Sequence, residues 1–210
     1  MIHKKKALLA VFCIAALVLG TMAATYAYFT DSEKAVNTFT VGRVKITLDG
    51  ANVDNKMSGI VRDQENKYHL LPGHKYVKDP TVHVVPNSSD CYVYVTVENQ
   101  IVDIECDDAD YKNIATQMIA NNWVLLEDEN GQQVLKDNKL VYAHKDRVAQ
   151  SAVQRDLVVF EEFKVDGEKG TNDSLAKHKD SKIIVNAYAI QAAGFDNALE
   201  AWNTASKAFN

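Results

Sequence analysis

The chain lacks the motifs of the common zinc, hydrolase and nucleotide sites. It contains no H-E-x-x-H, the spacing that places two zinc-binding histidines on one helix face. A G-x-S-x-G nucleophile elbow and a glycine-rich phosphate loop are also missing. Five of its six histidines are scattered along the chain, at His69, His74, His83, His144 and His178. We therefore expect a protein that is not an enzyme, with no catalytic residue, metal or cofactor.

Positive charge is scarce beyond the N-terminus. All 28 acidic residues follow residue 27, whereas three of the 23 Lys and Arg residues precede it, so residues 28–210 carry a net charge of −8. An acidic surface argues against nucleic acid or an anionic membrane as a partner. The chain also has no long apolar run after Leu48 and no LPxTG-like sorting motif. Neither a second membrane span nor covalent attachment to a cell wall is expected.

Cysteine is rare as well, with three residues in the chain. Cys13 lies in an apolar N-terminal run, which leaves Cys91 and Cys106. A bridge between these two would stabilise the fold by about 3 kcal/mol, and export from the cell would permit it. Two free, semi-buried thiols are an equally good interpretation. Two cysteines alone do not make a metal site.

An acidic run lies between residues 103 and 110. Carboxylate oxygens suit hard cations, so the run could attract Ca²⁺. It lacks the glycine-bearing loop of an EF-hand, which favours the simpler interpretation of a solvated helix start. The members of the run are Asp103, Glu105, Asp107, Asp108 and Asp110.

The N-terminus has the three parts of an export signal. Lys4–Lys6 are positive, Ala7–Leu19 is an uncharged apolar run of 13 residues, and small residues follow up to Ala27. This order predicts a signal peptide over residues 1–27, cleaved between Ala27 and Tyr28. The alternative is an uncleaved anchor, because residues 7–27 carry no charge and could span a bilayer. The apolar run is too short for a span, which favours cleavage.

The segment after the predicted cut changes character along its length. Tyr28–Asn37 is polar and shows no turn chemistry that would fold it back. Apolar side chains then alternate in one phase at Phe39 and Val41, and in the opposite phase at Val44, Ile46 and Leu48. One inserted residue reverses the phase of a strand, so we expect a β-bulge at Gly42-Arg43.

Short alternating segments separated by turns predict a mainly β fold for the rest of the chain. Cys91–Glu98 has the clearest alternation. Lys182–Gln191 is apolar on both faces, as expected for a central strand that is covered on both sides. Pro80 and Pro86 bracket Thr81–Val85, which favours an edge or a strand end. Further strands are expected at Tyr68–Leu71, Trp123–Leu126, Gln132–Leu135 and Leu157–Val165, and a solvated loop at Asp166–Asp173.

Helical spacing is confined to two places. An interior helix is expected from Asp107 to Asn121, with an apolar stripe formed by Tyr111, Ile114, Ala115, Met118 and Ile119. A short C-terminal helix is expected after a cap at Asp196, with Leu199, Trp202, Ala205 and Phe209 on one side. The prediction is one antiparallel β-sandwich domain over residues 42–210, with one inserted helix and a short C-terminal helix.

Three stretches resemble a known family. The first is TYAYFTDSEKAVNTFTVGRVKITLD, the second is PGHKYVKDP, and the third is VNAYAIQAAGFDNALEAW. Together they resemble the TasA/camelysin (CalY) family of Gram-positive bacteria, whose members are exported and matured by the signal peptidase SipW. The resemblance implies a jelly-roll-like sandwich that assembles into extracellular fibres of the biofilm matrix.

The resemblance also implies a mechanism, in which the mature N-terminal segment of one subunit enters the sheet of the next. Here the donor segment would be residues 28–41, with anchors at Phe29, Val36, Phe39 and Val41 and a change of phase at Gly42. The implied partners are a SipW-type signal peptidase and other copies of the chain or related fibre subunits. The membrane would be a partner only before cleavage.

The expected location is outside the cell, in the matrix or on the cell surface. Two other functions stay open from the sequence. One is a camelysin-like surface metalloprotease, and the other is an accessory or surface-binding subunit that does not polymerise.

Overall fold

The structure is a computed structural model that describes residues 30–34, 37–39, 44–53, 62–64, 66–152 and 155–209. For residues 30–34 and 37–39 it describes the backbone alone. Its strands are β1 (Thr30–Lys34), β2 (Asn37–Phe39), β3 (Ile46–Ala51), β4 (Arg62–Asp63), β5 (Lys75–Val77), β6 (Thr81–Val84), β7 (Cys91–Asn99), β8 (Trp123–Leu125), β9 (Leu135–Lys136), β10 (Lys139–His144), β11 (Asp156–Val158), β12 (Glu162–Lys164) and β13 (Ile183–Gln191). Its helices are α2 (Ile114–Ala120), α3 (Asn172–Lys177), α4 (Ala198–Ala205) and the 3-10 turn η1 (Ser206–Ala208).

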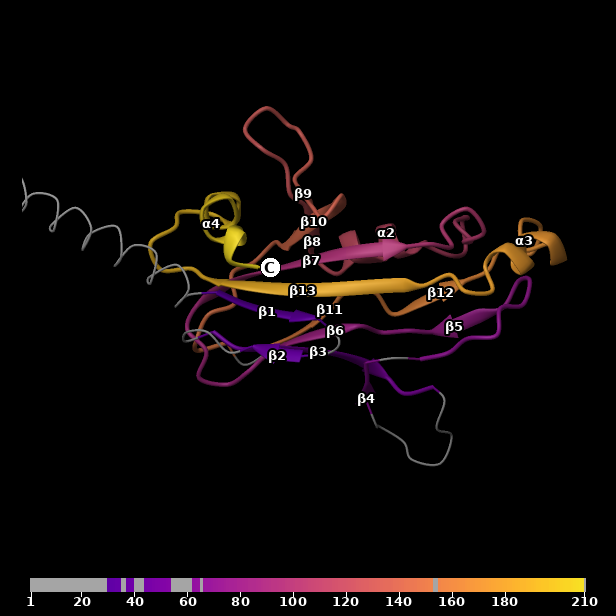
Figure 1. Cartoon of the computed structure of the whole chain (residues 1–210), viewed down its shortest axis with the longest axis horizontal. Helices are drawn as coiled ribbons and strands as arrows, with labels where there is room; N and C mark the ends of the chain where they lie inside the picture. Colours follow the sequence, from indigo (N-terminus) through magenta and orange to yellow (C-terminus); the bar gives the residue numbers. More distant parts are fainter. Residues whose placement is uncertain are drawn as a thin grey trace, which may run out of the picture.

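The strands form three antiparallel sheets (Figure 1). The largest has the order β2-β1-β13-β7-β10-β8, and β9 pairs with β10 beside this path. A second sheet has the order β11-β6-β3-β4, and a third consists of β12 and β5. The expected mainly antiparallel β fold is confirmed.

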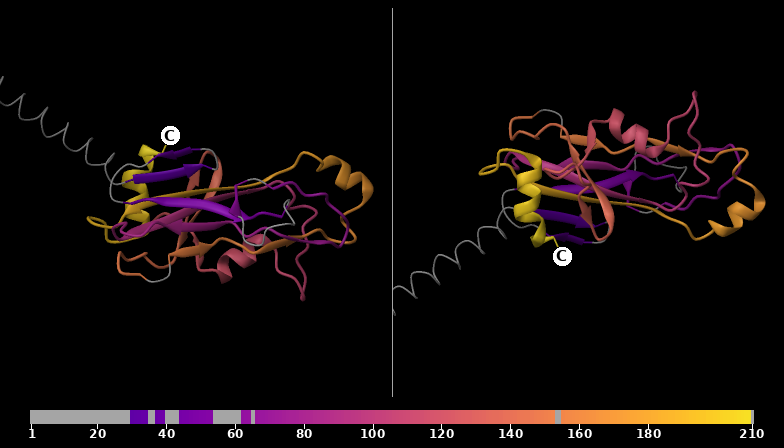
Figure 2. Two further views of the ribbon diagram at one scale, coloured as in Figure 1. Left: turned by 90° about the horizontal axis from the view of Figure 1, so that it is seen from below. Right: turned by 90° about the horizontal axis from the view of Figure 1, so that it is seen from above.

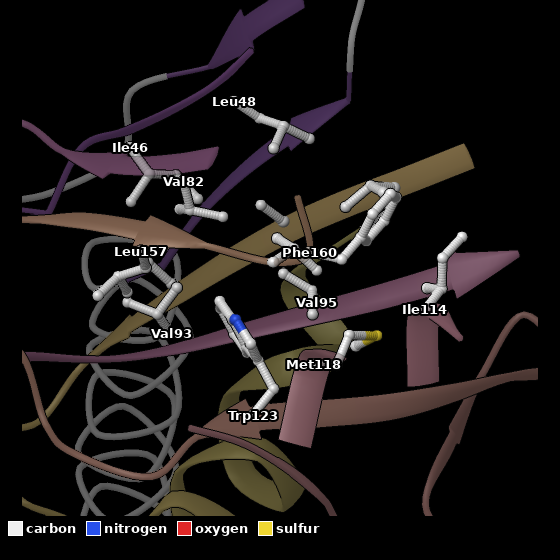
Figure 3. Close-up of a cluster of buried hydrophobic side chains, with 14 of the residues drawn as sticks. Ile46, Leu48, Val82, Val93, Val95, Ile114, Met118, Trp123, Leu157 and Phe160 are labelled. Atoms are coloured by element: carbon white, nitrogen blue, oxygen red, sulfur yellow. The ribbon is translucent and has the colours of Figure 1, made fainter. Parts of the chain in front are cut away.

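The main core lies between the seven-stranded and the four-stranded sheets (Figure 3). Val93 and Val95 of β7 face this core, and the neighbouring strand β13 adds Val185, Ala187 and Ala189. The opposite side of the core comes from Ile46, Leu48, Val82, Val84 and Leu157. Trp123 and Phe160 fill the space between the layers and are fully buried. The alternation of β7 therefore sends its odd-numbered residues inward, as the sequence predicts.

Jelly-roll connectivity of the strands stays a prediction.

A second, smaller core covers the outer face of the large sheet. Helix α4 lies across one end of this sheet (Figure 2). The Trp202 ring of α4 lies 4.9 Å from the ring centroid of Tyr94 and 5.7 Å from that of Tyr188. Phe209, just beyond η1, packs against Tyr188 as well, with 5.0 Å between the two ring centroids. Strand β13 is thus covered on both faces, which confirms the expectation for Lys182–Gln191.

Pro80 and Pro86 mark the two ends of strand β6, as one of the two expected interpretations has it, but the strand is internal, so the alternative of an edge position was wrong. It pairs with β3 on one side and with β11 on the other. Both prolines lie just outside Thr81–Val84, so the missing proline N–H groups interrupt no ladder bond. The carbonyl of Pro80 still accepts a hydrogen bond from the Val159 N–H at 2.8 Å. A proline next to a strand therefore does not place that strand at an edge.

Three further predictions are corrected. The expected strand Leu157–Val165 is divided into β11 and β12, because the side-chain oxygen of Gln117 accepts from the N–H groups of Glu161 and Glu162 and replaces a strand partner there. Tyr68–Leu71 is not a strand. The loop expected over Asp166–Asp173 leads into helix α3, whose N-cap is Thr171.

The interior helix α2 is present but shorter than expected. Asn113 caps it by accepting a hydrogen bond from the Thr116 N–H, and the buried Glu105 carboxylate accepts one from the Ile114 N–H at 2.7 Å. Ile114 and Met118 face the core. Ile119, which the sequence places on the same stripe, is 67% exposed. The C-terminal helix begins one residue later than expected, with Asn197 in place of Asp196 as its cap.

Two isoleucines of α2 test this orientation. Ile114 is 2% exposed and Ile119 is 67% exposed. I114A should lower the free energy of unfolding by about 2–5 kcal/mol, because it leaves a cavity in the core. The matched variant I119A should change it by no more than about 0.5 kcal/mol. Urea denaturation measures both values, and similar losses for the two variants would contradict this packing.

Candidate functional site

The N-terminal segment forms a hairpin along one edge of the large sheet. Strand β1 pairs with β13, with Thr30 opposite Ile190 and Glu33 opposite Ala187. Strand β2 then pairs with β1, with Lys34 opposite Asn37. Strand β2 is therefore the outermost strand at this end of the sheet, opposite the end formed by β8 (Figure 1).

This arrangement differs from the expectation of an exposed segment that does not fold back. The sequence shows no turn chemistry between Lys34 and Asn37, yet the two residues are cross-strand partners. The edge of β13 supplies backbone hydrogen-bond partners from a part of the chain about 150 residues away. Such long-range pairing leaves no local signal in the sequence.

The two sides of β13 are covered to different extents. On one side all nine of its residues, Ile183–Gln191, pair with β7. On the other side only Ala187–Ile190 pair with β1. Among the described residues, no strand pairs with Ile183–Asn186 on the β1 side. The hairpin therefore pairs with about half of the residues of β13.

Several of the predicted site residues lie outside the described residues. These are the cleavage site Ala27 and Tyr28, the anchors Phe29, Val36 and Val41, and Gly42 at the expected bulge. The backbone of Phe39 is described, and this residue pairs with Ser32. Beyond the bulge, the expected inward-facing residues Val44, Ile46 and Leu48 are all buried.

The two cysteines are free and buried. Cys91 is the first residue of β7, and Cys106 follows the far end of that strand. A strand of nine residues is about 27 Å long, whereas disulfide formation needs Cα atoms within about 7 Å. The structure thus supports the interpretation of two free thiols. Burial raises the pKa of Cys91 to about 12, which keeps the thiol protonated and unreactive.

The acidic run of residues 103–110 is divided among separate structural contacts. Glu105 accepts hydrogen bonds from the Ile114 N–H and, at 2.7 Å, from the Asn99 side chain. Burial raises the pKa of Glu105, and these two bonds oppose the rise. Asp103 contacts His178 at 3.1 Å, and Asp108 accepts from the Cys106 thiol.

The described part of the chain has neither a cluster of metal-binding side chains nor a helix suited to a membrane. No group of three or more His, Cys, Asp or Glu side chains there is placed to hold a metal ion. No helix in that part is long and apolar enough to cross a membrane.

A polar network crosses the outer face of the four-stranded sheet. The sequence analysis did not predict this network. The imidazole of His83 on β6 contacts Asp156 of β11 through Nδ1 at 2.7 Å and Asp49 of β3 through Nε2 at 3.0 Å. Arg62 of β4 continues the network by pairing with Asp49 and Asp79. All four strands are connected in this way. The polar positions that alternate with the core residues are the only local signal for such a network.

Comparisons of the chain with protein-family models, with curated proteins and with solved structures give no significant match.

The His83 network predicts a pH dependence of stability. Burial lowers the pKa of His83, but the hydrogen bonds to Asp156 and Asp49 outweigh it and raise the pKa above its usual value of 6.5. A raised pKa means that the charged form stabilises the fold below pH 6.5, and that this contribution is lost as the pH rises through the folded-state value. The contribution should reach about 1 kcal/mol, because the network is partly solvated.

Unfolding measured in urea at several pH values tests this dependence. Relative to H83Q, the wild-type protein should lose stability as the pH rises from 6.5, whereas H69Q, at an exposed histidine, should follow the wild type. A constant difference between wild type and H83Q across this range would contradict the proposed charge state.

Proposed function

We propose that the protein is an exported structural subunit that polymerises into extracellular fibres of a matrix. In this proposal, a SipW-type peptidase cuts between Ala27 and Tyr28, and residues 28–41 of one copy then join the sheet of the next. The observation that supports it most is the position of the N-terminal hairpin, which lies at a sheet edge, with its strand β1 paired along β13. The family resemblance supports the same function.

Exchange of this strand between copies needs no new kind of contact. β1 is joined to β13 by backbone pairing at four positions, from Thr30 to Glu33. The same strand of a second copy can make the same backbone hydrogen bonds, as in other cases of β-strand addition. Each copy then gives its segment to one neighbour and receives a segment from another. This head-to-tail contact does not close on itself, so it grows a filament.

The donor segment can leave its own sheet without unfolding the domain. Val44 and Ile46, just after the segment, are fully buried in the main core, so the domain holds the chain firmly from residue 44 onward. The N-terminal hairpin lies outside this anchor and pairs, among the described strands, only with β13. Departure of the hairpin breaks the four β1–β13 pairs, whereas removing β3 would disrupt both the core and the four-stranded sheet.

Cleavage provides the natural switch for assembly. Before the cut, residues 1–27 would hold the donor segment at the membrane. After the cut, the new N-terminus at Tyr28 is free to reach a neighbouring copy. The acidic charge of residues 28–210 keeps the released subunits soluble until their sheet edges meet.

Deletion of the donor tests this function. Residues 28–210 should form filaments, whereas a variant without residues 28–38 should stay a folded monomer, because the core from Val44 onward is intact. Negative-stain electron microscopy and circular dichroism measure assembly and folding. Filaments formed by the folded deletion variant would show that the segment is not the donor.

A proline exchange gives a matched pair of point variants. Glu33 lies in β1, opposite Ala187, and E33P removes a backbone N–H from a strand that is paired on both sides. Glu129 lies second in the exposed turn from Asp128 to Gly131, where proline is well tolerated. We expect E33P to lower filament yield at least about tenfold and E129P to leave it unchanged. Equal yields, measured by sedimentation, would contradict the role of β1.

A further inference from the structure

We propose that the hairpin opens when the donor segment enters a neighbouring copy. Residues 30–37 would then form one straight strand along β13 of that copy and cover positions 183–190 instead of 187–190. This inference depends on the proposed function and adds to it the register and length of the intermolecular strand. Three observations support it.

The first observation is the uncovered half of the β13 edge. Among the described residues, Ile183–Asn186 have no strand partner on the β1 side, although the same residues pair with β7 on the other side. In an extended strand, about half of the residues direct their N–H and C=O groups to each side. The open stretch therefore presents backbone groups that an additional strand can pair with, next to the apolar side chains of Ile183, Ile184 and Val185.

The second observation is the register of β1. Thr30 lies opposite Ile190, and each step forward along β1 is one step back along β13. The same register continued past Glu33 would bring Lys34 to Asn186 and Asn37 to Ile183. Between them, Val36 would lie opposite Ile184, and paired β-branched side chains stabilise neighbouring strands. No bulge or shift is needed to extend the strand.

The third observation is the balance of strand pairs. Opening the hairpin removes three cross-strand pairs between β1 and β2, from Ser32–Phe39 to Lys34–Asn37. A straight strand gains four pairs with β13, at positions 183–186. The connection between β1 and β2 is Ala35-Val36, and neither residue has the positive-φ preference of Gly, Asn or Asp that two-residue hairpin turns use. The fold-back is therefore weakly encoded.

Chain connectivity explains why the folded-back form exists at all. Within one molecule, the chain must return after β1 to Val44, which is buried at the start of β3. Four residues lie between Phe39 and Val44, so the two Cα atoms are five steps apart and at most about 18 Å from each other. β2 brings the chain back toward that point. A donor strand that belongs to another molecule has no such return to make over the acceptor sheet, so it can stay straight.

Intermolecular disulfides distinguish the two arrangements. Singly substituted N37C and I183C proteins are mixed, allowed to form filaments and oxidised. In a straight strand the two residues are direct partners, within the 4.4–6.8 Å that a disulfide requires. In an exchanged hairpin, residue 37 is two strand spacings, or about 10 Å, from β13. We expect crosslinked dimers on a non-reducing gel, and wild-type protein, whose two described thiols are buried, is the blank.

A second pair of variants separates this inference from the proposed function. D31C mixed with A189C should crosslink in either arrangement, because this register is shared by the hairpin and the straight strand. V36C with I184C repeats the first test if I183C fails to fold. Crosslinks at 31–189 without any at 37–183 or 36–184 would overturn the straight strand and leave donor exchange intact. Filaments without crosslinks at any of these pairs, or no filaments, would overturn donor exchange itself.

Discussion

The pairing of β13 with β7 is the interaction on which the rest of the structure depends. Nine consecutive residues of each strand are joined, from Ile183–Asn99 to Gln191–Cys91. Because side chains alternate along a strand, this central pair supplies the main core on one face and the smaller core under α4 on the other. Loss of this pairing would expose both cores at once.

The same constraint creates the edge that can carry function. Strand β13 is held in place by its pairing with β7 and by the side-chain layers on its two faces. In the described part of the chain, strand pairing on the second edge is limited to Ala187–Ile190, and the N-terminal segment provides it. A rigid edge covered by a detachable strand of the same chain is the arrangement that donor exchange requires. In the proposed donor exchange, β13 would be the acceptor strand, and the register would be that of the β1–β13 pairing within one chain.

How far the sequence predicts the structure depends on how local the deciding interactions are. The alternation of β7, the two apolar faces of β13 and the spacing of Trp202 and Phe209 were sufficient to predict a central strand covered on both sides and the apolar side of the C-terminal helix. The internal position of β6 was not predictable, because its neighbours β3 and β11 are far away in sequence. The break after β11 depends on the side chain of Gln117, and the exposure of Ile119 depends on how α2 lies on the core. At the candidate site, the donor segment was predicted from its resemblance to a family, but its partner strand lies about 150 residues away and left no local signal.

The central claim is that a copy of the mature chain extends the sheet of the next copy. The most direct measurement is negative-stain electron microscopy of purified residues 28–210, alone, over a series of increasing concentrations. Donor exchange between identical copies predicts unbranched filaments, one subunit wide, whose number rises with concentration. Folded monomers at every concentration would contradict it, because a chain that carries both the donor strand and the acceptor edge needs no other protein to assemble.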